Sequence, residues 1–451
     1  MIKRELYLEK LRNSYDSELI KVIMGMRRCG KSVLLGQIMD ELKEKGIKEN
    51  HIIYINFEDY DYIEYTEPKK FNEYVKSKIK DKEKYYLFFD EIQDVQDFER
   101  VINSFRATMN VSIFITGSNS KLLSGELATH LTGRFISIKM MPFTYSEFLE
   151  LKKSRNEEIT EKTFEEFIEW GGMPLIYNTT NDLERKMYLR DLYSAIILKD
   201  IVERNKIKDI SLLNKIIQFM MENIGGIISS NSIAGYLKND KVNTSVDTVM
   251  NYVEYITTSS IFNKVNRYDI RGKNVMATLE KYYLTDLGLL MLKSSPIEKK
   301  IGGRLENIVY NELIARGYEV YIGKTDRGAV DFVVDKFGDR EYIQVADYLS
   351  SDEVVKREFG AFKQVDDNFP KYVITMDKKN YSQNGIIHMN IEEFLLKNKK
   401  KKVNPVPFIL PFVQNFDNKN FKPKKNSLNY KKVNLREPFF ANVNKLIDNS
   451  T

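Results

Sequence analysis

The sequence predicts an α/β protein of several domains, and three observations lead to this prediction. Short apolar runs alternate with charged amphipathic stretches, such as residues 32–45, over the first 150 residues. Helical spacing dominates residues 160–296, and strands alternate with helices again over residues 301–396. Unbroken apolar strands alternating with helices indicate a parallel sheet covered on both faces. The five runs of the first part are Leu19–Met24, Ile52–Phe57, Tyr85–Phe89, Val111–Thr116 and Phe135–Met140.

The middle of the chain is predicted to be helical and to contain a winged helix-turn-helix. The segments Glu184–Glu203 and Leu212–Ile224 place apolar residues at i, i+3 and i+4, which indicates helices. Residues 244–247 form a capping-box pattern that opens a helix through Thr257. A strand, a polar tip over residues 266–274 and a second strand follow, as in the wing of such a domain.

Residues 301–396 are predicted to form a second α/β domain. A helix is expected from about Leu305 to Arg316, and strands are expected at 319–322, 330–334, 342–345 and 371–375. The last 55 residues hold five of the ten prolines, eleven asparagines and a run of four lysines, which is a linker-like composition. The predicted divisions are therefore 1–150, 151–300, 301–396 and a basic tail, 397–451.

Charge and composition exclude several classes of protein. The chain has 70 Lys+Arg and 64 Asp+Glu, a net charge of +6, but residues 397–451 carry 13 Lys+Arg and 3 Asp+Glu. The remainder is mildly acidic, so the overall charge does not by itself predict nucleic-acid binding. Cys29 is the only cysteine and the three histidines lie far apart, which argues against a disulfide framework or a His-based metal cluster. No apolar run is long enough to cross a membrane, and we expect a cytoplasmic protein without membrane contact.

A phosphate-binding loop is predicted between the first strand and the helix after it. Residues 25–32 read Gly-Met-Arg-Arg-Cys-Gly-Lys-Ser, which fits G-x-x-x-x-G-K-[ST] in the context that the motif requires. The glycines let backbone N–H groups surround the phosphates, and the helix N-terminus favours an anion. Lys31 would reach the β- and γ-phosphates of ATP, and Ser32 would bind Mg²⁺. The predicted nucleotide-binding residues are Gly25, Met26, Arg27, Arg28, Cys29, Gly30, Lys31, Ser32 and Val33.

Two carboxylates at the end of the third apolar run fit the same chemistry. Asp90 would hold Mg²⁺, and Glu91 would act as the general base that polarises the attacking water. An acidic strand end alone is weak evidence, but its position sixty residues after a phosphate loop strengthens it.

Two further residues are candidates for the catalytic step. Asn119 or Ser118, after the fourth run, could position water against the γ-phosphate, and an ordinary Asn/Ser turn is an equally compatible interpretation. Arg134, before the fifth run, could reach the γ-phosphate of a neighbouring subunit as an arginine finger, the alternative being a surface arginine. The finger would require a homo-oligomer.

With these motifs in place, the chain resembles a prokaryotic family of AAA-type ATPases. The resemblance covers about residues 1–396 and implies a strand order of 5-1-4-3-2 in the first domain. It also implies that the last domain is similar to restriction endonucleases. The motifs that carry it are Gly25–Ser32, Asp90-Glu91, 116–119, 132–134, 142–148, 171–174, 304–306, 330–332 and Gln344-Val345.

The endonuclease-like domain is predicted to be catalytically inactive. Such nucleases use a helix glutamate, an aspartate and then Glu-x-Lys on the next strand, where carboxylates hold Mg²⁺ and the lysine orients water. Glu306 and Asp331 match the first two positions, but Gln344 and Ala346 replace the glutamate and the lysine. Loss of a charged ligand and of the ammonium should severely weaken metal binding and catalysis.

The winged helix leaves DNA binding undecided. Its expected recognition helix, 245–260, contains two acidic residues and no Lys or Arg, which opposes contact with a polyanion. The wing carries Arg267, Arg271 and Lys273, which could contact phosphates. A packing module with a solvated basic loop is an equally compatible interpretation.

The main prediction is a Mg²⁺-dependent ATPase that remodels or regulates a nucleic-acid or protein partner. A slow ATP-dependent switch without significant turnover, an ATP-gated DNA nuclease and a structural adaptor without nucleotide binding are the alternatives. We expect ATP and Mg²⁺ as cofactors.

Overall fold

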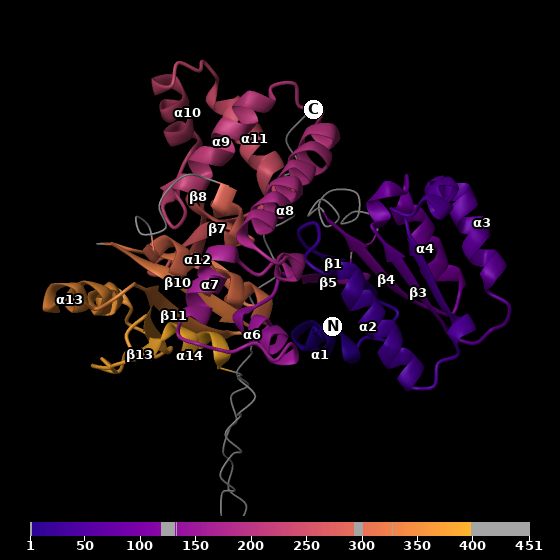
Figure 1. Ribbon diagram of the computed structural model, residues 1–451, viewed down its shortest axis with the longest axis horizontal. Helices are drawn as coiled ribbons and strands as arrows, with labels where there is room; N and C mark the ends of the chain where they lie inside the picture. Colours follow the sequence, from indigo (N-terminus) through magenta and orange to yellow (C-terminus); the bar gives the residue numbers. More distant parts are fainter. Residues whose placement is uncertain (1, 119–130, 132, 293–300, 327, 398–451) are drawn as a thin grey trace, which may run out of the picture. The chain divides into compact units, whose positions relative to one another are not determined.

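The computed structural model describes residues 2–118, 131, 133–292, 301–326 and 328–397 (Figure 1). The predicted site residue Asn119 and the tail 398–451 lie outside the described residues. Among those that are described, no helix has the length and apolar character needed to span a membrane.

The first sheet has five strands and all of its pairs are parallel. Its order, β2-β3-β4-β1-β5, confirms the 5-1-4-3-2 order that the family resemblance implies. The strands are β1 (Ile20–Met24), β2 (Ile52–Asn56), β3 (Tyr85–Asp90), β4 (Val111–Gly117) and β5 (Phe135–Lys139).

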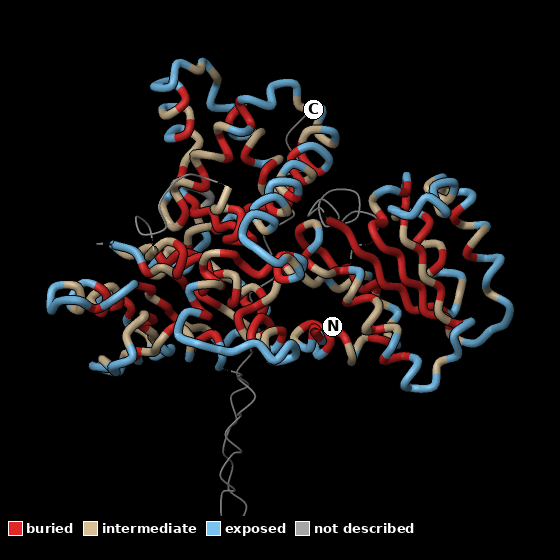
Figure 2. Tube along the Cα trace, in the orientation of Figure 1, coloured by how far each residue is buried: buried red, intermediate tan, exposed pale blue. Residues whose placement is uncertain are grey.

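Helices cover both faces of this sheet, which is why its strands read as continuous apolar runs. Side chains alternate between the faces along a strand. On β3, Leu87 and Phe89 pack with residues of α3 and α4, whereas Phe88 packs with residues of α1 and α2. The buried strands are drawn in red in Figure 2. The four helices are α1 (Glu5–Arg12), α2 (Lys31–Glu44), α3 (Pro68–Lys78) and α4 (Phe98–Thr108).

A helical region follows the first sheet. It comprises α6 (Tyr145–Ser154), α7 (Lys162–Trp170), α8 (Asp182–Ala195), α9 (Ile210–Glu222), α10 (Ser230–Asn239) and α11 (Val246–Thr258). The expected long helix over 184–203 is α8 continued by a π-helical segment, η6 (Ile196–Glu203). Short 3-10 helices are η1 (Glu49–His51), η2 (Tyr60–Thr66), η3 (Ile92–Asp94), η5 (Pro174–Asn178), η7 (Leu287–Leu292) and η9 (Ala361–Gln364).

The second sheet has eight strands in the order β13-β12-β11-β10-β9-β7-β8-β6. The predicted wing, β7 and β8, is an antiparallel pair, and β7 also pairs in parallel with β9, which lies in the segment predicted as the last domain. The wing and the last α/β segment therefore share one sheet, which local sequence patterns do not reveal. The strands are β6 (Ile227–Ile228), β7 (Phe262–Asp269), β8 (Asn274–Leu284), β9 (Glu319–Thr325), β10 (Gly328–Lys336), β11 (Asp339–Val345), β12 (Lys371–Thr375) and β13 (Ile387–Asn390). The accompanying helices are α12 (Ile301–Arg316), α13 (Asp352–Gly360) and α14 (Ile391–Leu396).

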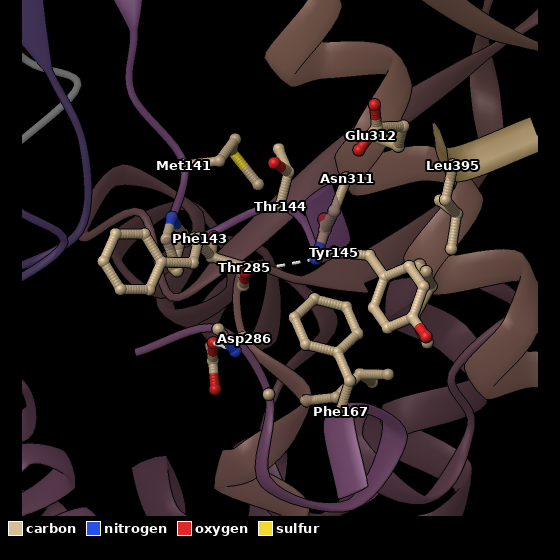
Figure 3. A pocket seen from close by; sticks show the side chains of 15 residues that line it. Met141, Phe143, Thr144, Tyr145, Phe167, Thr285, Asp286, Asn311, Glu312 and Leu395 are labelled. Carbon is tan, nitrogen blue, oxygen red and sulfur yellow. Dashed lines mark hydrogen bonds between the residues drawn. The ribbon is translucent and has the colours of Figure 1, made fainter. Parts of the chain in front are cut away.

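Two of the sequence motifs, 142–148 and 171–174, meet around a buried carboxylate. The backbone N–H of Gly172 donates to Asp286 Oδ2 at 2.7 Å, and the N–H of Phe143 donates to the carbonyl of Gly172 at 2.7 Å. Gly171 has φ +74°, and a Cβ there would lie 2.1 Å from Asp286 Oδ1. Burial raises the pKa of Asp286 to about 7. Figure 3 shows Phe143 and Asp286 among the residues lining a small cavity at this junction, so the two motifs join segments that lie far apart in the sequence.

Candidate functional site

The predicted phosphate loop joins β1 to α2 and is held by close backbone contacts. A Cβ on Gly25 would lie 2.3 Å from the carbonyl oxygen of Met140, so no larger residue fits there. Gly30 is the N-cap of α2 with φ +106°, a conformation that favours glycine. The loop therefore turns into the N-terminus of a 14-residue helix, where backbone N–H groups and the helix dipole favour an anion.

Lys31 and Glu91 form a buried ion pair beside this loop. The Lys31 ammonium lies 3.1 Å from Glu91 Oε1, and it also donates to the carbonyls of Gly25 at 3.2 Å and Met26 at 3.5 Å. Burial acts to lower the pKa of Lys31, but the neighbouring acidic groups, with Glu91 first among them, together raise that pKa. Burial acts to raise the pKa of Glu91. The nearby Lys31 ammonium acts in the opposite direction, and the pKa of Glu91 is lowered overall. Both groups are therefore charged near neutral pH.

Asp90 is fixed at the end of β3 by two hydroxyl groups. Thr116 on the neighbouring strand β4 donates to Asp90 Oδ1, and the Tyr54 hydroxyl donates to Oδ2 at 3.2 Å. The Thr116 hydroxyl also accepts the N–H of Glu91 at 3.0 Å, where Glu91 has φ +52°. This left-handed backbone turns the Glu91 side chain toward Lys31 and is a strained conformation of the kind that clusters at functional sites. Thr116 belongs to the motif 116–119, but the sequence alone predicts no site role for it or for Tyr54.

The donor set fits Mg²⁺. Ser32 is exposed at the start of α2, and Asp90 is buried at the end of β3, so a hydroxyl and a carboxylate are offered at the same edge of the sheet. Mg²⁺ prefers oxygen ligands and usually retains several waters beside one or two carboxylates and substrate phosphates.

The remaining loop residues have different environments. Met26 and Cys29 are buried, and Cys29 Sγ lies 3.7 Å from the Met140 carbonyl oxygen. Burial raises the pKa of the Cys29 thiol, so it is a packing residue and not a reactive thiolate. Arg28 is exposed, with φ +64°, and Val33 is half-buried on α2.

A buried arginine from the start of the chain supports the loop from behind. Arg4 Nε pairs with Glu147 Oε1 at 2.8 Å, and Arg4 Nη1 donates to the Cys29 carbonyl at 2.9 Å. Arg4 Nη2 donates to the Met141 carbonyl at 2.7 Å. Sequence analysis missed Arg4, because a single arginine near the N-terminus carries no local signal of burial.

The two remaining candidates lie apart from the ion pair. Ser118 is buried, and its hydroxyl donates to Asp200 Oδ1 at 3.3 Å. Arg134 is exposed, and its Nη1 donates to Asn103 Oδ1 at 3.0 Å. An exposed position is what an arginine acting on a neighbouring subunit requires, but its role stays a prediction.

Two carboxylates of residues 301–396 belong to a second buried polar cluster, and Lys281 lies between them. Lys281 Nζ lies 2.5 Å from Glu306 Oε1 and 3.2 Å from Asp331 Oδ1. Tyr283 also donates to Glu306, and burial raises the pKa of Glu306 to about 7. Gln344 Oε1 accepts the N–H of Asp331 at 3.2 Å, so the glutamine contributes a structural hydrogen bond. Sequence analysis did not place Lys281 here, because it arrives from the wing strand β8.

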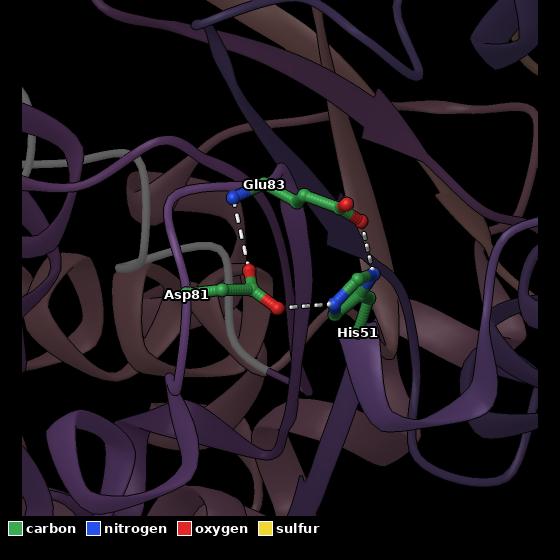
Figure 4. Close-up of side chains that lie close together, drawn as sticks. All are labelled: His51, Asp81 and Glu83. Atoms are coloured by element: carbon green, nitrogen blue, oxygen red, sulfur yellow. Dashed lines mark hydrogen bonds and ion pairs between the residues drawn. The ribbon is translucent and has the colours of Figure 1, made fainter.

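A histidine between two carboxylates lies at the opposite end of β2 from the phosphate loop (Figure 4). His51 Nε2 is 3.1 Å from Asp81 Oδ2, and Nδ1 is 3.5 Å from Glu83 Oε2. Each ring nitrogen faces a different carboxylate. Because a metal ion binds one imidazole nitrogen, the two carboxylates do not converge on a single position beside the ring.

The three basic residues of the predicted wing have different surroundings. Arg271 forms an ion pair with Asp326 at the surface, and Lys273 is exposed in the turn between β7 and β8. Arg267 is half-buried on β7.

Comparison with known proteins defines the class. Residues 17–149 match the family described as an AAA domain, and residues 161–296 match a domain of unknown function (DUF8612). Together with the five-stranded parallel sheet, this makes the first domain an AAA-type P-loop ATPase domain.

Two curated proteins are similar over most of the chain. One, an uncharacterized protein of Haemophilus influenzae, is 36% identical over 402 residues, which cover 88% of this chain and 99% of that protein. The other, from Methanocaldococcus jannaschii, is 30% identical over 421 residues and covers 90% of each chain. The chain belongs to the family of these proteins. In this chain an AAA domain is followed by a domain of unknown function.

Solved structures also match, at low scores. Cdc6p from Pyrobaculum aerophilum is 12% identical, with a TM-score of 0.27 over 68% of this chain and 93% of that chain. The Orc1 protein of Aeropyrum pernix, solved in complex with DNA, is 11% identical, with a TM-score of 0.28 over 70% and 94%. Scores this low carry no argument about function.

Proposed function

We propose that this protein is a Mg²⁺-dependent ATPase that uses ATP to remodel or regulate a partner. The observation that carries the proposal is the convergence of Lys31, Asp90 and Glu91 beside a glycine-shaped loop at a helix N-terminus. This arrangement offers donors for phosphates, oxygen ligands for a divalent ion and a carboxylate for water.

Each residue has a separate role in this proposal. The backbone of residues 25–32 binds the phosphates, and Lys31 neutralises charge on the β- and γ-phosphates. Ser32 and Asp90 would hold Mg²⁺, which supplies further charge neutralisation when bound. Glu91 accepts the proton of the attacking water, for which its lowered pKa keeps it ionised at neutral pH.

The test is ATP hydrolysis by the purified full chain, measured as released phosphate. Wild type should turn over ATP with Mg²⁺, and Lys31→Ala should lose both binding and turnover. Lys43→Ala is a matched control, since Lys43 lies on the same helix and pairs with Glu49 at the surface. Absence of hydrolysis at every protein concentration contradicts the proposal.

A slow switch is the second candidate, and the ion pair between Lys31 and Glu91 supports it. Phosphates would have to displace Glu91 from the ammonium, so binding itself rearranges the site. Glu91→Gln separates the two: an ATPase loses its function in the cell, whereas a switch driven by binding stays active.

Arg134 acting between subunits is part of the ATPase proposal. The rate per molecule should then rise with protein concentration as a homo-oligomer forms, and Arg134→Ala should abolish this rise without weakening ATP binding. A rate independent of concentration argues against the finger.

The proposed partner is a nucleic acid or a protein. DNA contact through the wing predicts that duplex DNA stimulates turnover and that the triple change of Arg267, Arg271 and Lys273 to Ala removes the stimulation. An ATP-gated nuclease is disfavoured, because Lys281 takes the place between Glu306 and Asp331 that a metal ion would need.

A further inference from the structure

A buried carboxylate of the helical region touches both sides of the candidate ATP site. Asp200 lies in η6, and only 1% of it is exposed. Its Oδ2 accepts from Arg27 Nε at 3.1 Å, and its Oδ1 accepts from Arg27 Nη2 at 3.3 Å and from Ser118 Oγ at 3.3 Å. One side chain therefore joins the phosphate loop and the end of β4 to a segment that lies far along the sequence.

Arg27 is fixed by this contact. Two parallel hydrogen bonds between a guanidinium and a carboxylate set both the distance and the orientation. The third nitrogen, Arg27 Nη1, pairs with Glu58 Oε1 at 2.6 Å. Burial acts to lower the pKa of Arg27, but Asp200 and Glu58 outweigh it and raise that pKa. Arg27 thus connects the loop to the helical region, and its guanidinium is already paired with two carboxylates.

The helix that carries Asp200 is itself unusual. The segment η6 continues α8 with π-helical hydrogen bonding. A π-helical turn inserts a residue into the helix, changes the direction of its side chains and is frequent at functional sites. Arg204, four residues on, places Nη2 3.5 Å from Asp200 Oδ1. The charge of this buried carboxylate is therefore balanced by arginines from two different segments.

We propose that Asp200 is a positioning residue that holds the phosphate loop in shape and couples nucleotide binding to η6. The inference rests on the proposed ATP binding at residues 25–32. Any movement of the loop around phosphates must move Arg27 relative to Asp200 or carry η6 with it. By thermodynamic linkage, a contact that changes on binding also changes the affinity for the nucleotide.

Two variants weaken this contact in different ways. Asp200→Asn keeps the shape of the side chain but removes its charge, and Arg27→Lys keeps the charge but cannot form the paired hydrogen bonds. Each should raise the Kd for ATP about tenfold. The double variant should be little worse than either single one, because both remove the same contact.

Glu312→Gln provides the matched control. Glu312 is a buried carboxylate that pairs with Arg316 Nε at 2.7 Å within α12 and makes no hydrogen bond to residues 25–32. It reproduces the loss of a buried charged partner without touching the loop. The circular dichroism spectrum of each variant is first compared with that of wild type to show that the variant is folded.

The experiment combines ATP binding by calorimetry with hydrogen exchange of the full chain. ATP should slow the exchange of amides 196–203 in wild type and in Glu312→Gln, but not in Asp200→Asn or Arg27→Lys. Equal ATP affinity in Asp200→Asn and Glu312→Gln, or unchanged protection of η6, overturns the coupling while leaving the ATPase proposal intact. If wild type binds no ATP, the proposed function falls, and this inference falls with it. If Asp200→Asn does not fold, Arg27→Lys decides the question alone.

Discussion

Lys281, on the wing strand β8, places its ammonium 2.5 Å from Oε1 of Glu306 on α12. Asp331 on β10 is a second partner of the same ammonium, at 3.2 Å. The lysine thus neutralises carboxylates that would otherwise repel each other in a buried place. Sequence analysis predicted loss of nuclease chemistry from Gln344 and Ala346, and Lys281 gives the acidic pair a structural role instead.

Lys281→Met should destabilise the protein strongly. Removing one partner of a buried ion pair leaves uncompensated charge and typically costs about 3–5 kcal/mol. Adding Glu306→Gln to Lys281→Met should restore part of the loss, because one fewer carboxylate is then unpaired. Urea unfolding measures the three free energies. If the free energy of unfolding of Lys281→Met lies within about 1 kcal/mol of wild type, as for a surface ion pair, the cluster is solvated.

Glu91→Gln should bind ATP more tightly than wild type while losing turnover. Glu91 competes with the phosphates for Lys31 and repels them, so removing its charge favours binding by a factor of a few, about 1 kcal/mol. Loss of the general base should slow hydrolysis about 10²–10⁴-fold. Calorimetry and phosphate release measure the two effects.

Asp94→Asn is the control for that change. Asp94 is the last residue of η3, three residues after Glu91. The substitution removes the same charge as Glu91→Gln but leaves the ion pair between Lys31 and Glu91 intact. If both variants bind ATP equally well, the gain in Glu91→Gln reflects overall charge and not the specific ion pair.

Arg4→Lys should loosen the phosphate loop from behind. Lysine can keep the charge near Glu147, but it cannot reach the carbonyls of Cys29 and Met141 with a planar group. Leaving buried acceptors unpaired costs about 1–3 kcal/mol, so the free energy of unfolding and the ATP affinity should both fall.

Arg12→Lys serves as its comparison. Arg12 pairs with Glu5 and Glu41 on the outer side of α1 and α2, remote from the loop carbonyls. It should change ATP affinity little. An equal loss in both variants would mean that Arg4 acts through general stability.

The sequence alone predicts the first sheet correctly, because each strand has its own local pattern of residues. Each strand of that sheet is a continuous apolar run, and residues 25–32 and Asp90-Glu91 stand at strand ends. In parallel sheets these ends share one edge, so proximity of Lys31 and Glu91 follows from order alone.

The contacts that the sequence did not reveal join segments distant along the chain. Asp200 meets Arg27, Lys281 meets Glu306, and β7 pairs with β9, each through tertiary packing. A buried Asp or Lys has the same local neighbours as an exposed one. Its partner is set by how whole elements pack, which periodicity and capping patterns do not encode.

Lys21 should make stability depend on pH above neutrality. It is fully buried on β1, where its Nζ donates to the Ser17 carbonyl at 3.1 Å and the Ser112 hydroxyl at 2.6 Å, both neutral groups. Burial lowers its pKa to about 7 from the ordinary value of 10.5. Between these values the unfolded chain holds a proton that the folded chain has released, so unfolding becomes more costly as pH rises, by at most about 1.4 kcal/mol per pH unit. Below about pH 7 Lys21 is protonated in both the folded and the unfolded chain. Its contribution to the free energy of unfolding is then constant and at its least favourable value.

Lys21→Met isolates this effect, since methionine fills a similar space without a charge. The difference in unfolding free energy between the variant and wild type, measured in urea at pH 7, 8 and 9, should favour the variant most at pH 7 and shrink with each step. Lys10 and Lys139, whose pKa values burial lowers to about 8, titrate in both proteins and cancel in this difference. A difference that stays constant over the three pH values would mean that Lys21 remains protonated in the folded protein. The cation–π contact with Phe114, whose ring centre lies 4.4 Å from the ammonium, would then be the stabilising interaction that offsets burial.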